Sequence, residues 1–429
     1  MMLSRNIILS VFLLTLFSLP LNAQTVDKQK YLAENHEVLS LDKPNDFKLF
    51  DKDFYANDLF LLGEMHGTVD SYRVQEILVD ELTKKTNFKY YIIENTYPNS
   101  VKINKYLETG DEKYLDSVFE SLKGGFGYSR EYYEIYRHVY KLNQTLKAKD
   151  RIKFTGIDKF SSSVENLSYL GEILKEVNYK KGSIKNLDEV FSYKEKKITY
   201  GEWKNLFLDL SEDIKSDSAK YKKIFGKRFW EFEFIIENFA NSFPINEKRS
   251  GKPISEEETD DIRDTQMAKN FVTLYKNLNL KNEKMFGFFG REHTYQEAGK
   301  RTNWMTARFK VANPKVKIAT FSLRYMESNF MIPTYFLEQQ FGTKQEKLFF
   351  YGGFQNDDSP FVKAVGIGDL NAVEPTAEAV LFKLNGKNSP YNSLPDLVDE
   401  IADGKATTDY FDYAILLRKS KPTTPISEK

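Results

Sequence analysis

The chain contains no cysteine among its 429 residues. This absence excludes disulfide bonds, thiol nucleophiles and a lipid anchor attached through a cysteine. A chain of this length can form one large α/β domain or two domains, and it buries enough apolar surface to be stable without disulfides.

The chain also has no excess of basic over acidic residues, or of acidic over basic ones. Lys+Arg and Asp+Glu each number 62, so the formal net charge is zero. We therefore expect neither nucleic acid nor an anionic membrane surface as the main partner, and we expect a small-molecule substrate instead. The aromatic content of 15% and the charged content of 29% are typical of a globular protein and not of a disordered chain.

Short motifs of several common enzyme classes are absent as well. The sequence has no G-x-S-x-G, no P-loop, no H-E-x-x-H and no G-x-G-x-x-G after a predicted strand. Only four histidines are present. We expect His36 and His138 on the surface or in a second layer, which leaves His66 and His293 as candidates for proton transfer.

The only long apolar run lies at the N-terminus. Arg5 precedes apolar residues 7–19, and small residues surround Ala23, as in a secretory signal peptide. We predict that residues 1–23 are a cleaved signal and that the protein is periplasmic or secreted, with no stable membrane insertion after cleavage. An uncleaved anchor helix is the alternative, although the run is short for a bilayer.

Beyond residue 55, strand-like and helix-like patterns alternate. Strands are expected at residues 58–63, 90–95, 152–158, 283–290 and 316–323, with helical patterns between them. This alternation predicts an α/β fold with a mostly parallel central sheet and helices on both faces. Residues 347–353, 379–384 and 412–417 are predicted to be later strands of this sheet or of an edge extension.

The same pattern suggests how the chain is organised. We predict a polar lead at residues 24–55, a single domain at 56–420 with a helical insertion at about 178–250, and a disordered tail at 421–429. Aromatic residues follow a helical stripe in the insertion, which favours core packing, with a ring-lined lid as the alternative. This stripe comprises Phe229, Phe232, Ile236, Phe239 and Phe243. A capping box, Ser255-x-x-Glu258, then opens a helix to about Leu278.

Ionisable residues follow four of the predicted strands. Glu64 and His66 follow the first, Glu94 ends the second, Asp158 ends the third, and Arg291 and His293 follow the fourth. In an open parallel sheet, ligands bind beyond the carboxyl ends of the strands. The set is therefore either a hydrogen-bonded structural network or a functional site, and its convergence favours a site.

The helix after the insertion contributes two more candidates. Arg263 lies on the same stripe as Met267 and Phe271, and its part of the helix is expected near the strand ends. Arg263 with Asp264 is either a clamp for a substrate carbonyl or carboxylate, or a buried pair that orients the helix. Arg73, early in the first helix, is a weaker candidate for substrate binding.

The motifs GEMHGT, IIEN, GID, IRDTQMAKN and GREHTYQ, in this order, resemble the erythromycin esterase family within a wider superfamily of haem-uptake lipoproteins and Tiki-type metalloproteases. The resemblance covers roughly residues 55–325. It implies a metal-independent hydrolase in which His66 activates water and Glu64, Glu94, Arg263 and His293 complete the site. Glu64 and His66 are separated by one residue, a spacing common in the haem-uptake relatives.

Three functions are compatible with these residues. A histidine held by a carboxylate can take a proton from water, and an arginine or second imidazole can stabilise an oxyanion, which predicts hydrolysis of an ester or lactone-type carbonyl. Glu64, His66, Glu94 and His293 are also residue types that bind a divalent metal, whose water would be the nucleophile. The third compatible function is that of a periplasmic protein that binds haem without catalysis. We predict Asp158, Arg291, Asp264 and Arg73 to bind substrate and favour no cofactor, with metal and haem left open.

Overall fold

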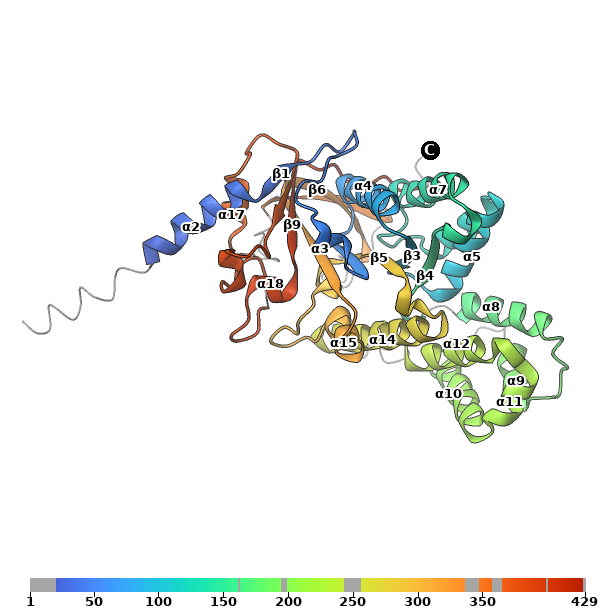
Figure 1. Cartoon of the computed structure of the whole chain (residues 1–429). Coiled ribbons are helices and arrows are strands. Elements are labelled where there is room, and N and C mark those ends of the chain that lie inside the picture. Colours follow the sequence, from blue (N-terminus) through green and yellow to red (C-terminus); the bar gives the residue numbers. More distant parts are fainter. Residues whose placement is uncertain are drawn as a thin grey trace, which may run out of the picture.

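The computed structural model describes residues 21–160, 163–193, 199–242, 256–335, 347–356, 365–398 and 400–426. Figure 1 shows a central sheet flanked by helices, with a group of helices extending from one side. The strands of the described chain form a single nine-stranded sheet. They are β1 (His36–Val38), β2 (Leu59–Glu64), β3 (Phe88–Ile93), β4 (Lys153–Gly156), β5 (Lys284–Gly290), β6 (Ile318–Pro333), β7 (Phe349–Asn356), β8 (Ala379–Lys383) and β9 (Tyr413–Arg418).

The sheet is mostly parallel, as predicted. Its strand order is β1-β8-β9-β6-β2-β5-β3-β4, and β7 pairs with β6 outside this path. Every neighbouring pair from β9 to β4 is parallel. The antiparallel pairs are β1 with β8, β8 with β9, and β6 with β7. β5 lies between β2 and β3, so the carboxyl ends of β2, β5, β3 and β4 are neighbours.

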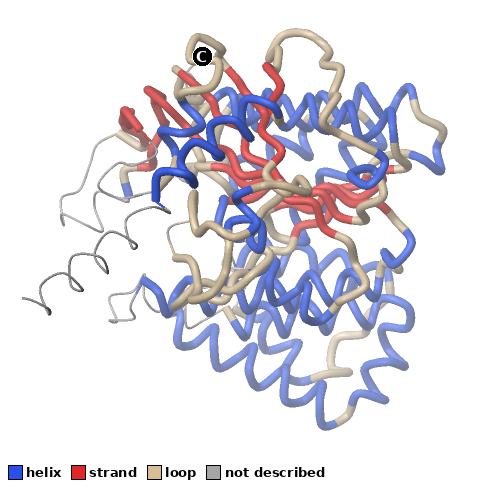
Figure 2. The backbone as a smooth tube through the Cα atoms, turned by 60° about the vertical axis from the view of Figure 1, so that its left-hand side comes forward, coloured by secondary structure: helices blue, strands red, loops and turns tan. Residues whose placement is uncertain are grey.

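Helices cover both faces of the sheet (Figure 2). One face carries α3 (Lys52–Tyr55), α4 (Val69–Lys85), α5 (Tyr97–Thr109), α6 (Lys113–Ser121) and α7 (Arg130–Thr145). The other carries α8 (Ser163–Glu176), α9 (Lys185–Ser192), α10 (Tyr200–Ser216), α11 (Ser218–Phe225), α12 (Phe229–Asn241), α14 (Glu256–Asn277) and α15 (Met305–Ala312). Helices α2 (Leu21–Glu34), α17 (Ile367–Asn371) and α18 (Thr407–Tyr410) lie with β8 and β9 at one end of the sheet.

Alternate residues of the central strand enter different cores. Phe60 and Leu62 of β2 pack with α4 and α7, whereas Leu59 and Leu61 pack with the helices of the other face. All six residues of β2 are buried. Successive strand residues point to opposite faces, so a strand buried on both sides must be apolar throughout. This explains the continuous apolar run that ends at Gly63.

The described part of residues 178–250, predicted to be a helical insertion, contains helices α9 to α12, and residues 194–198 and 243–250 lie outside the described chain. Phe229, Phe232, Ile236 and Phe239 are buried in one core, which supports core packing for this stripe, while Phe243 lies outside the described residues. Ser255 of the predicted capping box also lies outside them.

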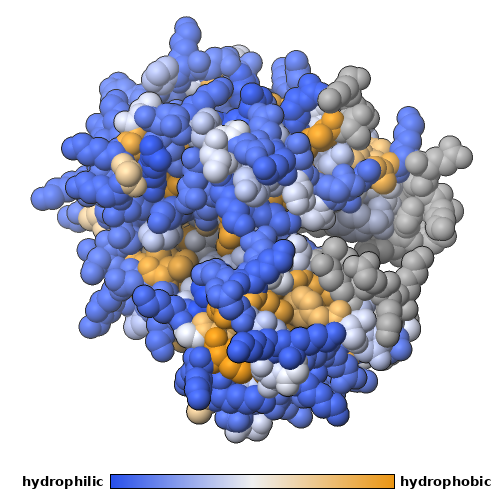
Figure 3. All heavy atoms as spheres, turned by 90° about the vertical axis from the view of Figure 1, so that its right-hand side faces the viewer, coloured by the Kyte–Doolittle hydropathy of each residue, from blue (hydrophilic) through white to orange (hydrophobic). Residues whose placement is uncertain are grey.

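Figure 3 shows a mainly hydrophilic surface, with hydrophobic side chains gathered in its lower half.

Two predictions for the C-terminal part of the chain need correction. The strand predicted at 316–323 continues to Pro333, because its second half pairs with β7. The prediction of a disordered tail is wrong for residues 421–426. Residues 421–425, which we name the C-terminal strap, accept hydrogen bonds from Val69 N (2.9 Å) and Arg130 N (2.8 Å), and Thr423 N donates to the Gly67 carbonyl (2.9 Å). Residues 427–429 lie outside the described chain.

The predicted polar lead also contains ordered elements. β1 adds to the edge of the sheet beside β8, and α2 packs on the body through Lys28, Gln29 and Tyr31. Within the described residues no helix has both the length and the apolar character needed to cross a bilayer. The apolar stretch at residues 7–19 is not among them.

Candidate functional site

The candidate site lies where β2, β5, β3 and β4 end. Side chains from these four strand ends and from α14 contact one another there, and they come from positions up to 229 residues apart in the chain, from Glu64 to His293. We name Glu64, His66, Glu94, Asp158, Arg263, Asp264 and His293 the strand-end cluster. Parallel strands place their carboxyl ends at one edge, which is the usual ligand-binding edge of such a sheet.

Glu64 and His66 form the first carboxylate–histidine pair. Glu64 is the last residue of β2 and is 1% exposed, and its Oε1 is hydrogen-bonded to Nδ1 of His66. The other oxygen, Oε2, has no hydrogen-bond partner in the described part of the chain. The His66 side chain is 30% exposed, which leaves the ring accessible.

A glycine sets the turn that carries His66. Gly67 has a φ of +100°, and a Cβ there would lie 2.3 Å from the carbonyl oxygen of Met331. Only glycine adopts this conformation without strain, and only glycine fits so close to the neighbouring backbone. The Met331 N–H in turn donates to the Gly67 carbonyl at 2.9 Å, which fixes the turn against β6.

His293 and Asp264 form the second pair. Nδ1 of His293 lies 2.9 Å from Oδ1 of Asp264, whose side chain is fully buried. The same oxygen accepts from the Met305 N–H at 2.6 Å, at the start of α15. The Thr306 hydroxyl donates to the backbone carbonyl of His293 at 2.7 Å. Both the ring and its carboxylate are therefore held in place.

Glu94 and Arg263 join the two pairs. Arg263 Nη2 donates to Glu94 at 2.6 Å and to Asp158 at 2.8 Å, and its Nε donates to Asp158 at 3.1 Å. Arg263 Nη1 lies 3.1 Å from Nε2 of His293. Glu94 also accepts from the Gly290 N–H at 2.7 Å.

Both imidazoles direct their Nε2 atoms toward the same carboxylate. His66 Nε2 is 3.7 Å and His293 Nε2 is 3.9 Å from Oε1 of Glu94. Each ring is thus tied at Nδ1 to its own carboxylate and faces a shared one at Nε2. A hydrogen bond from Nδ1–H to a carboxylate leaves Nε2 of the neutral ring with its lone pair available for a proton.

The charges in the cluster shift several pKa values. Burial alone would lower the pKa of His66, but the negative charges of Glu64 and Glu94 outweigh it and raise that pKa to about 10. Burial is likewise outweighed at His293, where Asp264 and then Glu94 raise the pKa to about 8. The carboxylates therefore favour the imidazolium form of both rings, and each ring becomes a base as the pH rises.

Glu94, Asp158 and Arg263 stay ionised. Burial would raise the pKa of Glu94, but Arg263 and then His66 hold it well below its ordinary value. Arg263 also lowers the pKa of Asp158 against the effect of burial. The two carboxylates in return keep the pKa of Arg263 well above its ordinary value, so this residue is a fixed positive charge.

Three residues predicted to bind substrate have other partners. Arg73 forms ion pairs with Asp70 and Asp42, which are outside the cluster. Arg291 is buried, and its Nη1 donates to the carbonyl of Leu323 on β6 at 3.2 Å. Asp264 is buried behind His293, where it orients the ring and does not form a clamp with Arg263.

Sequence reasoning missed two residues that border the cluster. The ring of Phe126 lies 5.1 Å from the ring of His66. It belongs to the sequence GGFGYS, in which an aromatic residue flanked by glycines was the available signal. A Cβ on Gly290 would lie 3.5 Å from Nε2 of His66 and 3.4 Å from Cδ2 of His293, so this glycine leaves space between the rings.

The four residues considered as metal ligands are hydrogen-bonded to one another or to Arg263 and Asp264. In the described ranges, no three His, Asp or Glu side chains are placed to hold a metal ion. Among the four predicted ligands, Glu94 is instead neutralised by Arg263, whose Nη2 lies 2.6 Å from Oε1. A guanidinium in that position competes with a divalent cation for the carboxylate.

Comparisons with known proteins show the fold. No protein-family model matches the chain, and no curated protein does. Three solved structures are similar over nearly the whole length. A histidine-to-asparagine mutant of erythromycin esterase EreC in its open conformation has a TM-score of 0.64 at 13% identity, covering 91% of this chain and 98% of that one.

The other two structures give nearly the same values. A succinoglycan biosynthesis protein has a TM-score of 0.63 at 14% identity, covering 92% of this chain and 97% of that one. A protein from Bacillus cereus has a TM-score of 0.63 at 14% identity, covering 94% and 99%. The chain therefore has an erythromycin esterase-like α/β fold, and at these identities the likeness concerns the fold alone.

Proposed function

We propose that this protein is a hydrolase in which His66 activates water for attack on an ester or lactone-type carbonyl of a small molecule. One observation supports this most directly. Two imidazoles are each held at Nδ1 by a carboxylate, and their Nε2 atoms lie 3.7 and 3.9 Å from the same Glu94 oxygen. Carboxylate-held imidazoles around a shared space are suited to proton transfer.

His66 is the better base of the two. Its side chain is 30% exposed, against 13% for His293, whose Nε2 is already contacted by Arg263. Neutral His66 takes a proton from water through Nε2, while Glu64 holds Nδ1–H and stabilises the imidazolium that forms. The hydroxide equivalent adds to the carbonyl carbon.

Arg263 stabilises the charge that develops. The carbonyl oxygen becomes an oxyanion, and a guanidinium held by Glu94 and Asp158 needs no reorientation to interact with it. Collapse of the tetrahedral intermediate breaks the bond to the leaving alkoxide. The imidazolium of His66 returns its proton to that oxygen, and the products are an acid and an alcohol, or a hydroxy acid from a lactone.

Two further observations agree with this proposal. The motifs that carry Glu64, Glu94, Arg263 and His293 resemble those of erythromycin esterases, and a structure with the same fold is an erythromycin esterase. No serine or cysteine nucleophile is needed, because water is the attacking group.

The test is hydrolysis of a panel of small esters and lactones by the purified protein. We expect activity in the wild type, a loss of about 1,000-fold in His66→Ala, and no loss after EDTA treatment. His138→Ala is the matched control, because His138 also pairs with a carboxylate, Asp80 at 2.7 Å, but lies outside the cluster.

Other results would contradict this function. Stoichiometric metal, with activity lost on chelation, would favour the metal-dependent hydrolase. Haem binding, followed by the Soret band and lost in a His66 and His293 double substitution, would favour a binding protein if no ester is hydrolysed.

We also infer that the protein acts outside the cytoplasm after cleavage behind Ala23. The side-chain contacts of α2 with the body involve Lys28, Gln29 and Tyr31, so removal of residues 1–23 leaves these contacts intact. N-terminal sequencing of the protein from its native host should find Gln24 first. A retained Met1 would contradict this inference.

A further inference from the structure

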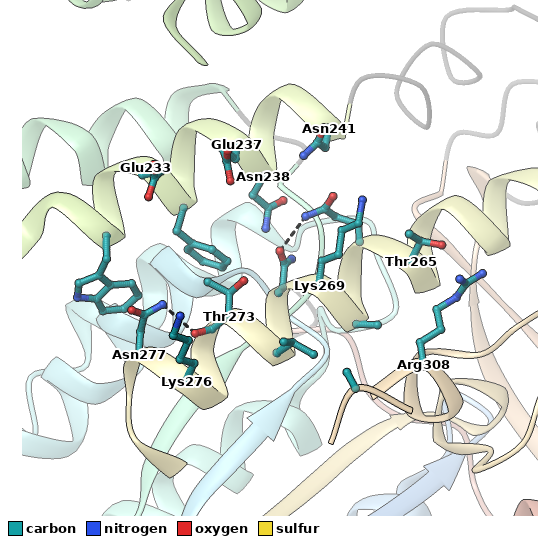
Figure 4. Close-up of a pocket in the computed structure, with 17 residues that line it drawn as sticks. Glu233, Glu237, Asn238, Asn241, Thr265, Lys269, Thr273, Lys276, Asn277 and Arg308 are labelled. Atoms are coloured by element: carbon teal, nitrogen blue, oxygen red, sulfur yellow. Dashed lines mark hydrogen bonds between the residues drawn. The ribbon is translucent and has the colours of Figure 1, made fainter. Parts of the chain in front are cut away.

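A cavity of about 690 Å³ lies between α12 and α14, away from the strand-end cluster. Figure 4 shows Glu233, Glu237, Asn238 and Asn241 on α12 facing Lys269, Thr273 and Lys276 on α14. None of the cluster residues lines it. Its volume is within the range of small-molecule sites.

The lining has the chemistry of a site for a neutral, hydroxyl-rich molecule. Seven of the 17 lining residues carry a neutral amide or hydroxyl group, while two are acidic and three are basic. Such groups both donate and accept hydrogen bonds, as sugar hydroxyls require. Mixed charge disfavours a polyanion or polycation, and the five charged side chains of the lining disfavour a lipid. Trp230 at the side of the cavity supplies an amphipathic ring for the apolar face of a sugar.

The floor of the cavity is held rigid by buried amides. Asn270 Nδ2 donates to the carbonyl of Ile157 at 2.8 Å, and Gln266 donates to Asn270 at 2.8 Å. Asn238 Oδ1 accepts from the Phe160 N–H at 3.1 Å. These bonds tie both helices to the segment that follows β4.

Some hydrogen-bonding groups at the cavity are left for a ligand. Asn238 is 1% exposed, and its Nδ2 has no hydrogen-bond partner within the described residues. A buried amide donor without an acceptor is uncommon, and a hydroxyl group of a molecule in the cavity would satisfy it. Glu237 and Lys269 add a carboxylate and an ammonium group to the lining of the cavity.

We propose that this cavity is a second binding site, separate from the strand-end cluster, for a short oligosaccharide. The sugar rings lie along the groove between α12 and α14, one of them against the indole of Trp230. Their hydroxyls bond to Asn238, Glu237 and Lys269.

Isothermal titration with maltotriose, cellotriose and triacetylchitotriose tests the site directly. We expect at least one trisaccharide to bind the wild type, and to bind at least tenfold more weakly to Trp230→Ala and to Glu237→Gln. Glu212→Gln is the matched control, because Glu212 is exposed on α10 and does not line the cavity. It should bind as the wild type does.

His66→Ala should also bind the sugar unchanged, which separates this site from the proposed hydrolase activity. The proposal is overturned if none of the three sugars binds, or if both cavity variants bind as tightly as the wild type. Loss of sugar binding in His66→Ala would overturn it too, because the sugar would then occupy the strand-end cluster.

Discussion

Oδ1 of Asp264 lies 2.9 Å from Nδ1 of His293, although Asp264 belongs to α14 and His293 to the segment after β5. Burial alone would lower the pKa of His293. The negative charge of the Asp264 carboxylate, which contacts Nδ1 of the ring, has the larger effect and raises this pKa to about 8. In Asp264→Asn we expect this pKa to fall, because the imidazolium loses its nearest negative charge. NMR titration can follow it, since the chain has four histidines.

Asp80→Asn is the control for this measurement. Asp80 lies 2.7 Å from His138 and raises its pKa through their hydrogen bond. Its loss should lower the pKa of His138 and leave His293 unchanged. A His293 pKa that stays near 8 in Asp264→Asn would show that the contact does not control the ring.

The pH dependence of hydrolysis should identify the base. The pKa of His66 is raised to about 10, so a neutral His66 becomes more abundant as the pH rises to that value. We expect kcat/KM to rise through this range. Glu94→Gln removes a negative charge that stabilises the imidazolium, so the rise should occur at lower pH, with a lower plateau because Arg263 loses a partner.

Asp264→Asn serves as the comparison in the same assay. It should leave the position of the rise unchanged, because Asp264 contacts His293 and not His66. If the rise also moves to lower pH in Asp264→Asn, then His293 is the base and the assignment of His66 is wrong.

Gly290→Ala should block the space between the imidazoles without unfolding the protein. The added methyl would lie 3.4 to 3.6 Å from His293, His66 and Glu94, which is ordinary van der Waals contact. We expect a melting temperature near that of the wild type and a loss of activity of about 100-fold. Gly368→Ala is the control, because no atom lies within 4 Å of its added methyl. Full activity in Gly290→Ala would mean that the reaction does not use this space.

Removal of the C-terminal strap should loosen the turn that carries His66. The strap forms backbone hydrogen bonds with Gly67, Val69 and Arg130. Three such bonds contribute about 3 kcal/mol in total, so a chain ending at Ser420 should lose about that much free energy of unfolding in urea. It should also lose activity, since Gly67 follows His66 directly.

A chain ending at Ile426 is the matched truncation, because it keeps all three hydrogen bonds. It should match the wild type in both measurements. Equal stability of the two truncated chains would show that the strap does not support the turn.

Much of the fold could be predicted because the signals are local. The apolar run before Gly63 and the helical spacing that follows it depend only on which side chains must be buried. The rule that ligands bind at the carboxyl ends of parallel strands then placed Glu64, His66, Glu94, Asp158 and His293 at one edge. Their mutual contacts in the structure agree with that placement.

The sequence by itself determined most of the strands, the mostly parallel sheet and the residue types at the strand ends, because these follow from periodicity and from the ends of apolar runs. Only the tertiary structure decided that Asp264 faces His293, that Phe126 lies against His66, and that residues 421–425 pair with Gly67 and Arg130. These contacts join segments far apart in the chain. Their geometry depends on how helices pack over a sheet in which β5 lies between β2 and β3, and no local pattern encodes that packing.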